Sequence, residues 1–339
     1  MANIVDNFTT LKEKLIKNRD DLKNTLINKG VNCTDKNKIS QLIQEVSSLR
    51  PKSLSWLGKK GSWTSGKASN MYAGTYYASS CSINNNIYVI GGAQDQQSSV
   101  QKYNVGTNTW ESFGSLGKAS IMAGVTNIGN DIYIIGSNSN TYAQVSNGVF
   151  NILTKTYTSL KDRPVACYGA FTEAVGDNIY SIAGFGSSDN LSSTANYCYN
   201  TKTNTWSTKQ SIPHVSAMGG SFVYDNKVYC LSGKNSSNHE YYNTATNTWT
   251  SVTSWDKANA YFGFTFIDNK FYCVGGNEVN SQNACVRYDV IKDSWETLAN
   301  YPDTRYGLCC GNAYGYLFAM GGYDSQSTTY NKTYVYEII

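Results

Sequence analysis

The stretch Ile87–Trp110, IYVIGGAQDQQSSVQKYNVGTNTW, decides the fold of this chain. It begins with a β-branched and aromatic run that ends at Gly91 and Gly92, where a chain adopts positive φ or approaches another backbone closely. A second run ends at Tyr103, turn residues follow, and Trp110 opens a third run. The stretch therefore predicts three antiparallel strands joined by turns.

The same pattern recurs along the chain. Glycine pairs or their substitutes lie 43 to 49 residues apart, at Gly91/Gly92, Gly136/Ser137, Ala183/Gly184, Ser232/Gly233, Gly275/Gly276 and Gly321/Gly322. Two aromatic columns keep step with the first five pairs, at Tyr103, Phe150, Tyr199, Tyr242 and Tyr288 and, seven residues later, at Trp110, Tyr157, Trp206, Trp249 and Trp295. Four short strands per repeat with this period are typical of β-propeller blades, so the sequence predicts an all-β, six-bladed propeller.

The order hydrophobic-Tyr-hydrophobic-hydrophobic-Gly-Gly, then Tyr, then Asn-Thr-Trp, resembles the kelch repeat. The resemblance runs from Trp63 to the C-terminus and is strong in the repeats of Tyr88, Tyr229 and Tyr272. It is weaker in the second repeat, where Ser137 and Tyr157 replace the family's Gly and Trp. The resemblance implies a six-bladed kelch β-propeller over residues 63–339.

The ends of the repeat array predict how the ring closes. The last repeat ends with a strand at residues 333–339 and lacks a Trp strand, whereas Trp63 precedes the first complete repeat at the spacing of a fourth-strand Trp. We therefore expect the segment around Trp63 to pair with the C-terminal strand and complete the sixth blade. Such closure removes a sheet edge that would otherwise invite aggregation.

Residues 1–50 show helical rather than strand periodicity. Two amphipathic stripes are present, the first with Ile4, Phe8, Leu11, Leu15, Leu22 and Leu26 and the second with Ile39, Leu42, Ile43, Val46 and Leu49. Gly30 ends the first stretch as a C-terminal cap, and the second stops before Pro51. The pattern predicts a small N-terminal α-helical hairpin, with residues 51–62 as the linker to the propeller.

A two-helix hairpin buries too little apolar surface to be comfortably stable alone. We expect residues 1–50 to serve assembly or attachment, by self-association or by docking on a larger assembly; packing on their own propeller is the alternative. The segment also resembles parts of tail fibre and receptor-binding proteins of Gram-positive bacteriophages and phage-tail-like particles. That resemblance implies other tail or baseplate proteins as partners.

Composition and charge exclude several function classes. The net charge of +4 is mild and the basic residues are scattered, so no nucleic-acid partner is expected. No apolar run approaches the ~20 residues of a membrane span, and no secretion signal is evident at the start, MANIVDNF. Nine cysteines without a C-x-x-C pair indicate buried reduced thiols, and two histidines make a zinc site improbable. No cofactor or metal is expected.

The candidate ligand contacts follow from the repeat alignment together with the kelch resemblance, which implies that ligands bind where the loops after the glycine pairs and the loops into the innermost strands emerge. Tyrosine faces beside amides and carboxylates suit carbohydrate, although solvated turns have the same composition. The candidates are Tyr76, Tyr77, Tyr168, His214, Asn259, Tyr261, Arg305 and Tyr306 before innermost strands, and Asp95, Asn190, Asn277 and Asp324 after glycine pairs.

Two further residues stand apart from this set. Glu173 lies in an innermost strand, where the equivalent positions hold Cys81, Thr126, Phe222, Thr265 and Gly311. We expect it to point into a solvated central channel, with cation binding as the alternative. Trp255 resembles an exposed sugar-stacking residue, but its offset from Trp249 predicts that it packs at a blade corner.

Enzymatic functions have little support in the residues. A copper oxidase site needs more histidines than His214 and His239, and a sialidase needs an arginine cluster, whereas the propeller region carries Arg163, Arg287 and Arg305. A kelch sugar epimerase or mutarotase with Glu278 and His214 as acid and base is the best catalytic alternative.

The sequence thus favours a non-enzymatic binding protein that acts as a phage or phage-tail-like tail component. It would assemble in the bacterial cytoplasm, act outside the cell in the particle, and recognise bacterial surface glycan through one propeller face. A cytoplasmic kelch scaffold that binds a protein partner is the competing hypothesis.

Overall fold

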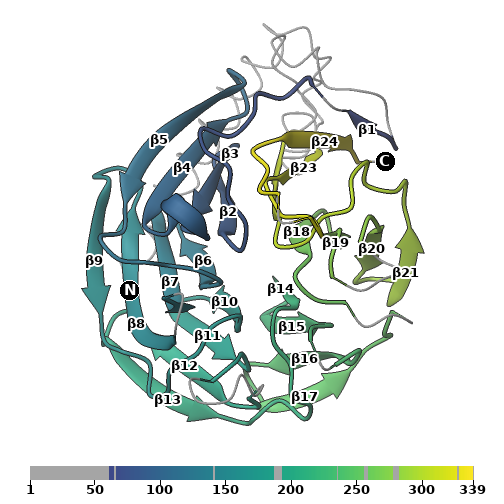
Figure 1. The fold of residues 1–339 in the computed structure, drawn as a ribbon. Coiled ribbons are helices and arrows are strands. Elements are labelled where there is room, and N and C mark those ends of the chain that lie inside the picture. Colours follow the sequence, from purple (N-terminus) through teal and green to yellow (C-terminus); the bar gives the residue numbers. More distant parts are fainter. Residues whose placement is uncertain are drawn as a thin grey trace, which may run out of the picture. The chain divides into compact units, whose positions relative to one another are not determined.

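The structure is a computed structural model, and it describes residues 61–338 apart from 65, 140–141, 187–192, 235, 256–258, 278–281 and 327. The described residues form six four-stranded antiparallel sheets arranged around a central axis (Figure 1). The prediction of an all-β six-bladed propeller is confirmed. The predicted helical hairpin and the linker up to residue 60 lie outside the described residues.

The first three blades follow one another along the chain, each from its innermost to its outermost strand. Blade 1 contains β2 (Ser79–Ile83), β3 (Asn86–Ile90), β4 (Ser99–Asn104) and β5 (Thr109–Ser115), with the 3-10 helix η2 (Gln94–Gln96) between β3 and β4. Blade 2 contains β6 (Gly124–Ile128), β7 (Asp131–Asn138), β8 (Ala143–Asn151) and β9 (Thr156–Leu160). Blade 3 contains β10 (Phe171–Val175), β11 (Asn178–Ile182), β12 (Asn196–Asn200) and β13 (Thr205–Lys209).

The remaining blades repeat this order, except that the last takes its outermost strand from the beginning of the described chain. Blade 4 contains β14 (Gly220–Tyr224), β15 (Lys227–Leu231), β16 (His239–Asn243) and β17 (Thr248–Ser251). Blade 5 contains β18 (Gly263–Ile267), β19 (Lys270–Val274), β20 (Cys285–Asp289) and β21 (Ser294–Thr297). Blade 6 contains β22 (Cys309–Ala313), β23 (Tyr316–Met320), β24 (Thr333–Glu337) and β1 (Trp63–Thr64).

Blade 6 closes the ring through the pairing of β1 with β24. Trp63 lies opposite Tyr336 and Thr64 opposite Val335 in the antiparallel register. The Trp63 ring packs on Tyr336 at 5.2 Å and on Tyr301 at 5.0 Å between centroids, and its Nε1 donates to the Ala299 carbonyl at 2.9 Å. This is the pairing that the spacing of Trp63 predicts, and it joins strands from opposite ends of the propeller sequence.

The blades pack face to face through apolar side chains. Second strands such as β3 and β19 are almost fully buried, because each lies mid-sheet with a neighbouring blade on either face. One cluster joins Ile90 of blade 1 to Ile134 of blade 2. Within the described part of the chain, no helix has both the length and the apolar character of a membrane span.

The glycine pairs are required because neighbouring blades touch there through their backbones. A Cβ on Gly91 would lie 1.9 Å from the Ser120 carbonyl oxygen of blade 2, and a Cβ on Gly92 would lie 2.0 Å from Thr75 Oγ1. The Gly92 amide donates to that same Ser120 carbonyl at 2.9 Å. The equivalent amides of Gly184, Gly233, Gly276 and Gly322 donate to Ser216, Asn259, Arg305 and Thr75. The glycine pair is thus an inter-blade hydrogen-bonding site.

At the outer edge, the Tyr-x4-Asn-x-Trp pattern forms a second inter-blade contact, which we call the outer clamp. In blade 4, Asn247 Oδ1 accepts from the Tyr242 hydroxyl at 2.6 Å and from the Gln210 amide of blade 3 at 2.9 Å. Trp249 Nε1 donates to the Gln210 carbonyl at 2.9 Å. The same three bonds occur at Asn108, Asn204 and Asp293. Each clamp ties a blade to the end of the preceding one.

Blade 2 lacks the outer clamp. Phe150 replaces the tyrosine and has no hydroxyl, Lys155 takes the left-handed position of the clamp asparagine with φ 57°, and Tyr157 replaces the tryptophan. The Tyr157 hydroxyl is buried without a hydrogen-bond partner in the described structure. The weak second repeat of the sequence therefore corresponds to a missing contact between blades 1 and 2.

We predict that Asn247→Ala lowers the free energy of unfolding by about 2–3 kcal/mol, because the Tyr242 hydroxyl and the Gln210 amide lose their shared acceptor. Urea unfolding of the full chain measures this loss. Lys155→Ala, at the equivalent left-handed position of the unclamped blade, is the matched control and should cost less than about 1 kcal/mol. Equal losses in the two variants would show that the clamp contributes nothing.

Candidate functional site

The candidate site residues share one end of the propeller because of the strand directions. In an antiparallel blade, the loop after the second strand and the connection into the next blade's first strand emerge at the same end. The loop with η2 and the segment that holds Tyr76 and Tyr77 both belong to this end, and a backbone bond from Ala93 to Tyr76 joins them. We call this end the loop face.

At the centre of the loop face, six residues form a closed ring of backbone hydrogen bonds. Each amide donates to the carbonyl of the equivalent residue in the preceding blade, at 2.6–3.0 Å. The members are Tyr77, Met122, Gly169, Met218, Tyr261 and Gly307. All six have left-handed φ values between 53° and 62°, which turn the amides and carbonyls along the circumference. We call this the central ring.

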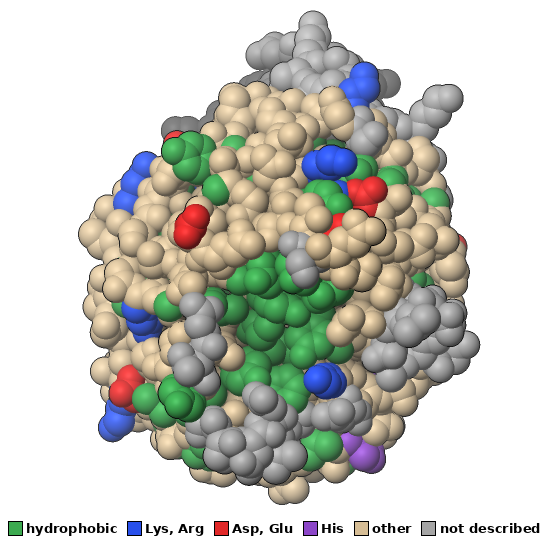
Figure 2. Space-filling view, in the orientation of Figure 1, with side chains coloured by type: hydrophobic (Ala, Val, Ile, Leu, Met, Phe, Trp, Pro, Cys, Tyr) green, Lys and Arg blue, Asp and Glu red, His purple; other side chains and the backbone are tan. Residues whose placement is uncertain are grey.

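The side chains of the central ring make the middle of the loop face apolar. Its two glycines leave room for neighbouring side chains: a Cβ on Gly169 would lie 2.4 Å from Met218 Cε, and a Cβ on Gly307 would lie 2.6 Å from Tyr77 Cδ1. Figure 2 shows hydrophobic side chains gathered in a hollow at this place. Met218 also packs with Tyr168, Phe185 and Ala217 nearby.

Tyrosines extend from this hollow toward the junction of blades 1 and 6. Tyr76 stacks on Tyr323, with ring centroids 4.5 Å apart and an interplanar angle of 27°. Tyr306 meets Tyr323 edge to face at 5.4 Å, and Tyr77 lies 5.5 Å from Tyr261 and 6.2 Å from Tyr306. We call these five residues the tyrosine cluster. It unites four of the predicted contacts, Tyr76, Tyr77, Tyr261 and Tyr306.

Four of the five tyrosines of the cluster are uncharged over the physiological pH range. Burial raises the pKa of Tyr76, Tyr77, Tyr261 and Tyr306, and neighbouring phenols raise it further. The hydroxyls therefore stay protonated and both donate and accept hydrogen bonds, while the rings offer apolar faces. Four of the five tyrosines belong to the connections into innermost strands, and Tyr323 follows the glycine pair of blade 6.

Polar groups border the stacked pair of Tyr76 and Tyr323. Gln94 is exposed, and its Nε2 donates to Thr329 Oγ1 at 2.9 Å across blades 1 and 6. Asp324 accepts from the Tyr330 hydroxyl at 2.7 Å and from two backbone amides of its loop. The Tyr330 hydroxyl and those amides hold the pKa of Asp324 below its usual range, so this carboxylate is charged and already hydrogen-bonded.

Two other predicted contacts lie exposed on separate loops. Asp95 is exposed in η2, and Asn277 is exposed after the glycine pair of blade 5, where its amide donates to Ala260. Asn190 lies outside the described residues. The structure therefore does not bring the side chains of Asp95 and Asn277 into the tyrosine cluster.

Arg305 is a correction to the sequence analysis. Its side chain is fully buried, with Nη1 donating to the Gly321 carbonyl at 3.1 Å and Nη2 paired with Asp303. The guanidinium also lies 3.8 Å from the centre of the Tyr330 ring. Arg305 holds blade 6 together from inside, so its side chain is not presented to a ligand.

Asn259 and Tyr168 are also buried rather than presented on the loop face. Asn259 Nδ2 donates to the Gly275 carbonyl at 2.9 Å, and its own carbonyl accepts from Gly233 of blade 4. Tyr168 is 8% exposed and packs on Phe185 at 5.2 Å. A polar residue before an innermost strand has a packing role here, because this position contacts the glycine pairs.

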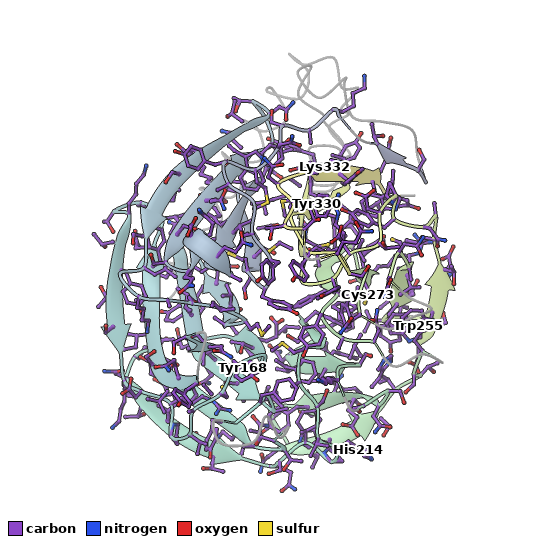
Figure 3. All side chains as sticks on the ribbon, in the orientation of Figure 1. Tyr168, His214, Trp255, Cys273, Tyr330 and Lys332 are labelled. Carbon is purple, nitrogen blue, oxygen red and sulfur yellow. The ribbon has the colours of Figure 1, made fainter. Side chains whose placement is uncertain are left out.

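His214 lies at the outer edge of the loop face, away from the tyrosine cluster (Figure 3). Its Nδ1 is 2.7 Å from Oε1 of Glu240, which is buried in β16. Side chains at the position of Glu240 in other blades also fix the connection that leads into their blade. Gln101 of blade 1 bonds the backbone of Ala73, and the Tyr334 hydroxyl of blade 6 donates to Asp303. The pair of His214 and Glu240 is therefore a loop anchor. The proposed acid partner Glu278 lies outside the described residues.

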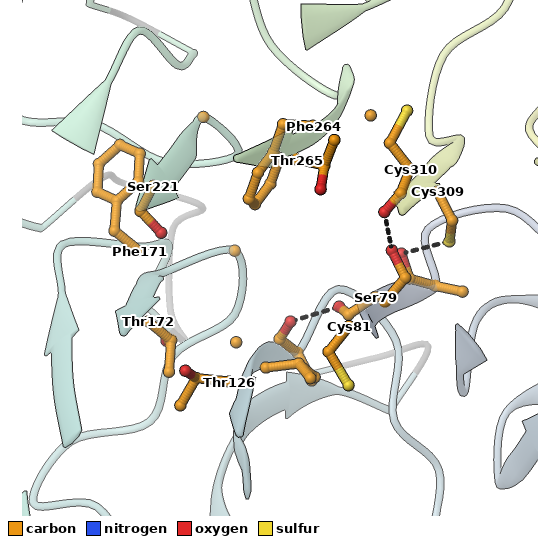
Figure 4. A pocket seen from close by; sticks show the side chains of 18 of the residues that line it. Ser79, Cys81, Thr126, Phe171, Thr172, Ser221, Phe264, Thr265, Cys309 and Cys310 are labelled. Carbon is orange, nitrogen blue, oxygen red and sulfur yellow. Dashed lines mark hydrogen bonds between the residues drawn. The ribbon is translucent and has the colours of Figure 1, made fainter. Parts of the chain in front are cut away.

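The central ring and the innermost strands line a half-open cavity of about 340 Å³ (Figure 4). Glu173 lines this cavity from β10 and accepts a hydrogen bond from Ser221 Oγ at 2.9 Å. Burial raises the pKa of this carboxyl from 4.5 to about 7. The expected orientation of Glu173 into the channel is thus observed.

The thiols and Trp255 have structural positions. Eight of the nine cysteines lie in the described part, all as free thiols, and burial raises the pKa of Cys81 and Cys309 to about 12. In that same part, no three His, Cys, Asp or Glu side chains gather as a metal site requires. Trp255 stacks on Trp295 at 6.1 Å, as the corner-packing prediction expects.

The six blades, the central ring and the ring closure define a six-bladed β-propeller. Residues 74–117 and 258–300 match one protein family described as "Kelch motif". Residues 166–213 match a second family with the same description. No curated protein matches the chain. The protein is therefore a six-bladed β-propeller that carries kelch motifs in these three stretches.

We predict that Gly307→Ala disturbs the tyrosine cluster, because the added Cβ would lie 2.6 Å from the Tyr77 ring and 3.2 Å from its amide. Gly117→Ala is the matched control, since it also has positive φ but no atom within 4 Å. Left-handed strain alone should cost the control about 1–2 kcal/mol, and Gly307→Ala should cost about 1–3 kcal/mol more. Urea unfolding decides, and equal losses would contradict close packing at the central ring.

We predict a second effect from the raised pKa of Glu173. A folded-state pKa above the unfolded value gives a contribution that is full below pH 4.5 and is lost as pH rises to about 7. Glu173→Gln should remove this loss, on the order of 1–3 kcal/mol between pH 4.5 and pH 8. Urea unfolding of both proteins at the two pH values measures it. Parallel pH profiles would contradict the burial of this charge.

Proposed function

We propose that the propeller is a non-enzymatic recognition module that binds bacterial surface carbohydrate at the junction of blades 1 and 6. The observation that carries this proposal is the stack of Tyr76 on Tyr323, which the polar pair of Gln94 and Thr329 borders. Partly exposed aromatic faces suit the C–H surface of a sugar ring, and an amide with a hydroxyl beside them suits its hydroxyl groups.

The non-enzymatic part of the proposal rests on the roles of the polar residues. His214 and Glu240 anchor a loop at a position where other blades use Gln101 or Tyr334. Arg305 is buried inside blade 6, where its guanidinium already has protein partners. In the described residues, the tyrosine cluster has no carboxylate pair or histidine among its members. Binding without bond cleavage is the function that this chemistry supports.

Residues 1–50 extend the proposal to a biological setting. Their likeness to tail fibre and receptor-binding segments supports a tail component of a phage or phage-tail-like particle, with these residues as the attachment to tail or baseplate proteins. The propeller would then face the bacterial surface. Immunogold labelling of particles with an antibody against the propeller tests this setting, and label confined to the cytoplasm would contradict it.

We predict that the double variant Tyr76→Ala/Tyr323→Ala loses at least about tenfold in affinity for a glycan that the full chain binds, since both stacking faces disappear. A glycan array identifies the ligand, and calorimetric titration measures the change. Gln94→Ala should lower the affinity for that glycan a few-fold. Tyr314→Ala, in a turn at the opposite end of the propeller, is the control with unchanged affinity. Equal binding by the double variant would place the site elsewhere.

The apolar hollow at the central ring favours a second candidate, a protein partner that inserts an apolar side chain. Met122, Met218 and Tyr261 line this hollow, and methionine side chains adapt well to a protein ligand. The scaffold function would be supported if the glycan array showed no binding and a defined protein ligand bound the Met218→Gln variant more weakly than the native chain. Glycan binding that Met218→Gln leaves unchanged would support the carbohydrate function.

A further inference from the structure

The channel below the central ring has two chemically different walls. Serine hydroxyls come mainly from blade 1, and phenylalanine rings come from blades 3, 4 and 5, with Glu173 of blade 3 and Ser221 of blade 4 among them. Thr126, Thr172 and Thr265 add hydroxyls from blades 2, 3 and 5. Its volume of about 340 Å³ exceeds the ~30 Å³ of one water molecule about tenfold and lies within the usual range of small-ligand pockets. The cavity is therefore large enough for a small organic molecule with a polar and an apolar part.

Three serine hydroxyls of this cavity donate their protons to other groups of the protein. Ser79 Oγ donates to the Ala123 carbonyl at 2.6 Å and Ser80 Oγ to the Cys310 carbonyl at 2.7 Å, and both serines line the cavity (Figure 4). Ser221 Oγ donates to Glu173. Because these three serine hydroxyls use their protons within the protein, their remaining lone pairs act as acceptors, whereas the Ser82 and Thr265 hydroxyls already accept from Asn312. The polar wall thus suits a ligand that donates hydrogen bonds.

Glu173 is the charged group that lines this cavity in the described residues, and no lysine or arginine in that part of the chain forms an ion pair with it. The strand on one side, β6, carries no ionisable side chain, and β14 presents Ser221. The titratable neighbours are the phenol of Tyr180, which lies opposite Glu173 in β11, the buried Cys230 thiol and, beside that thiol, Glu240. Glu173 and Glu240 both raise the pKa of the thiol. No positive charge balances Glu173 from any of these strands.

We propose that the central channel binds a small organic ammonium ion, whose N–H groups bond the Glu173 carboxylate and the serine oxygens while its hydrocarbon part lies against the phenylalanine wall. An ammonium group supplies both the missing positive charge and the hydrogen-bond donors. The hydrocarbon part suits Phe264 and Phe266, which line the same cavity. A bare metal ion would leave that apolar wall unused. Tyr77 and Tyr261 line this cavity and also belong to the tyrosine cluster, whereas the stacked pair of Tyr76 and Tyr323 is not part of its lining.

Binding depends on the ionisation of Glu173, so it has a defined pH dependence. With a carboxyl pKa of about 7, the free protein loses its Glu173 proton as pH rises through 7. Affinity for an ammonium ion should therefore rise from pH 5 to pH 8, where simple alkylamines remain protonated. Near pH 7, binding should release a proton, because the ligand favours the ionised carboxylate.

The test uses calorimetric titration of the full chain with n-butylammonium chloride, with n-butanol as the neutral analogue and potassium chloride as the inorganic cation. We expect millimolar or tighter binding of butylammonium at pH 8 and at least about tenfold weaker binding at pH 5. Near pH 7, the measured enthalpy should change with the ionisation enthalpy of the buffer. Glu173→Gln keeps the side-chain shape and should weaken binding about tenfold or more. Glu296→Gln, an exposed carboxylate on β21, is the matched control and should bind as the native chain does.

Three outcomes would overturn the proposal. Absence of butylammonium binding at pH 8, or equal binding by Glu173→Gln, would exclude the carboxylate as the anchor. Equal affinity for n-butanol would show an apolar cavity without charge recognition. Displacement of butylammonium by potassium at equal concentration would assign the site to metal cations instead. The glycan affinity of the native chain, measured in parallel, is unaffected by any of these results.

Discussion

Backbone-to-backbone contact between neighbouring blades is the constraint on which the rest of the propeller depends. At five of the six glycine pairs, an amide of one blade donates to a carbonyl of the next, and a side chain on Gly91, Gly275 or Gly321 would collide with that carbonyl. Glycine satisfies this approach, and the left-handed φ at Ala183 and Ser232 shows that the conformation is kept where glycine is replaced. The blades therefore stand at a spacing that the backbone sets.

The central ring follows from that spacing. With blades held together at the glycine pairs, the residues that precede the innermost strands meet around the axis and satisfy one another's amides and carbonyls. Their side chains are free to differ because the backbone alone makes the ring. Tyrosine and methionine side chains of the ring, and serine, threonine and glutamate side chains of the innermost strands, line one cavity and give it chemically different regions.

The sequence predicts the fold well because its repeats carry the register. The aligned positions Tyr77, Met122 and Tyr261 are equivalent in the structure, and the pairing of Trp63 with Tyr336 follows from spacing alone. The burial of Arg305 and Asn259 could not be derived in this way. The sequence alone does not distinguish a polar side chain that faces solvent before a strand from one that contacts a neighbouring glycine pair. Tyr323 likewise joins Tyr76 only because the ring closes, so a pair 247 positions apart gives no local signal.

At the junction of blades 1 and 6, the closure of the ring lies beside the tyrosine cluster. Blade 6 is assembled from distant segments, and the connection that leads from β1 into blade 1 carries Tyr76 and Tyr77. Where blades are equivalent in backbone, only side-chain differences can distinguish one part of the loop face from another. Tyrosines occupy consecutive positions at this junction, whereas blade 2 presents Ile121 and Met122 and blade 4 presents Ala217 and Met218 there. The chemical differences around the loop face therefore arise from such departures from the repeat, because the repeated residues hold the blades together.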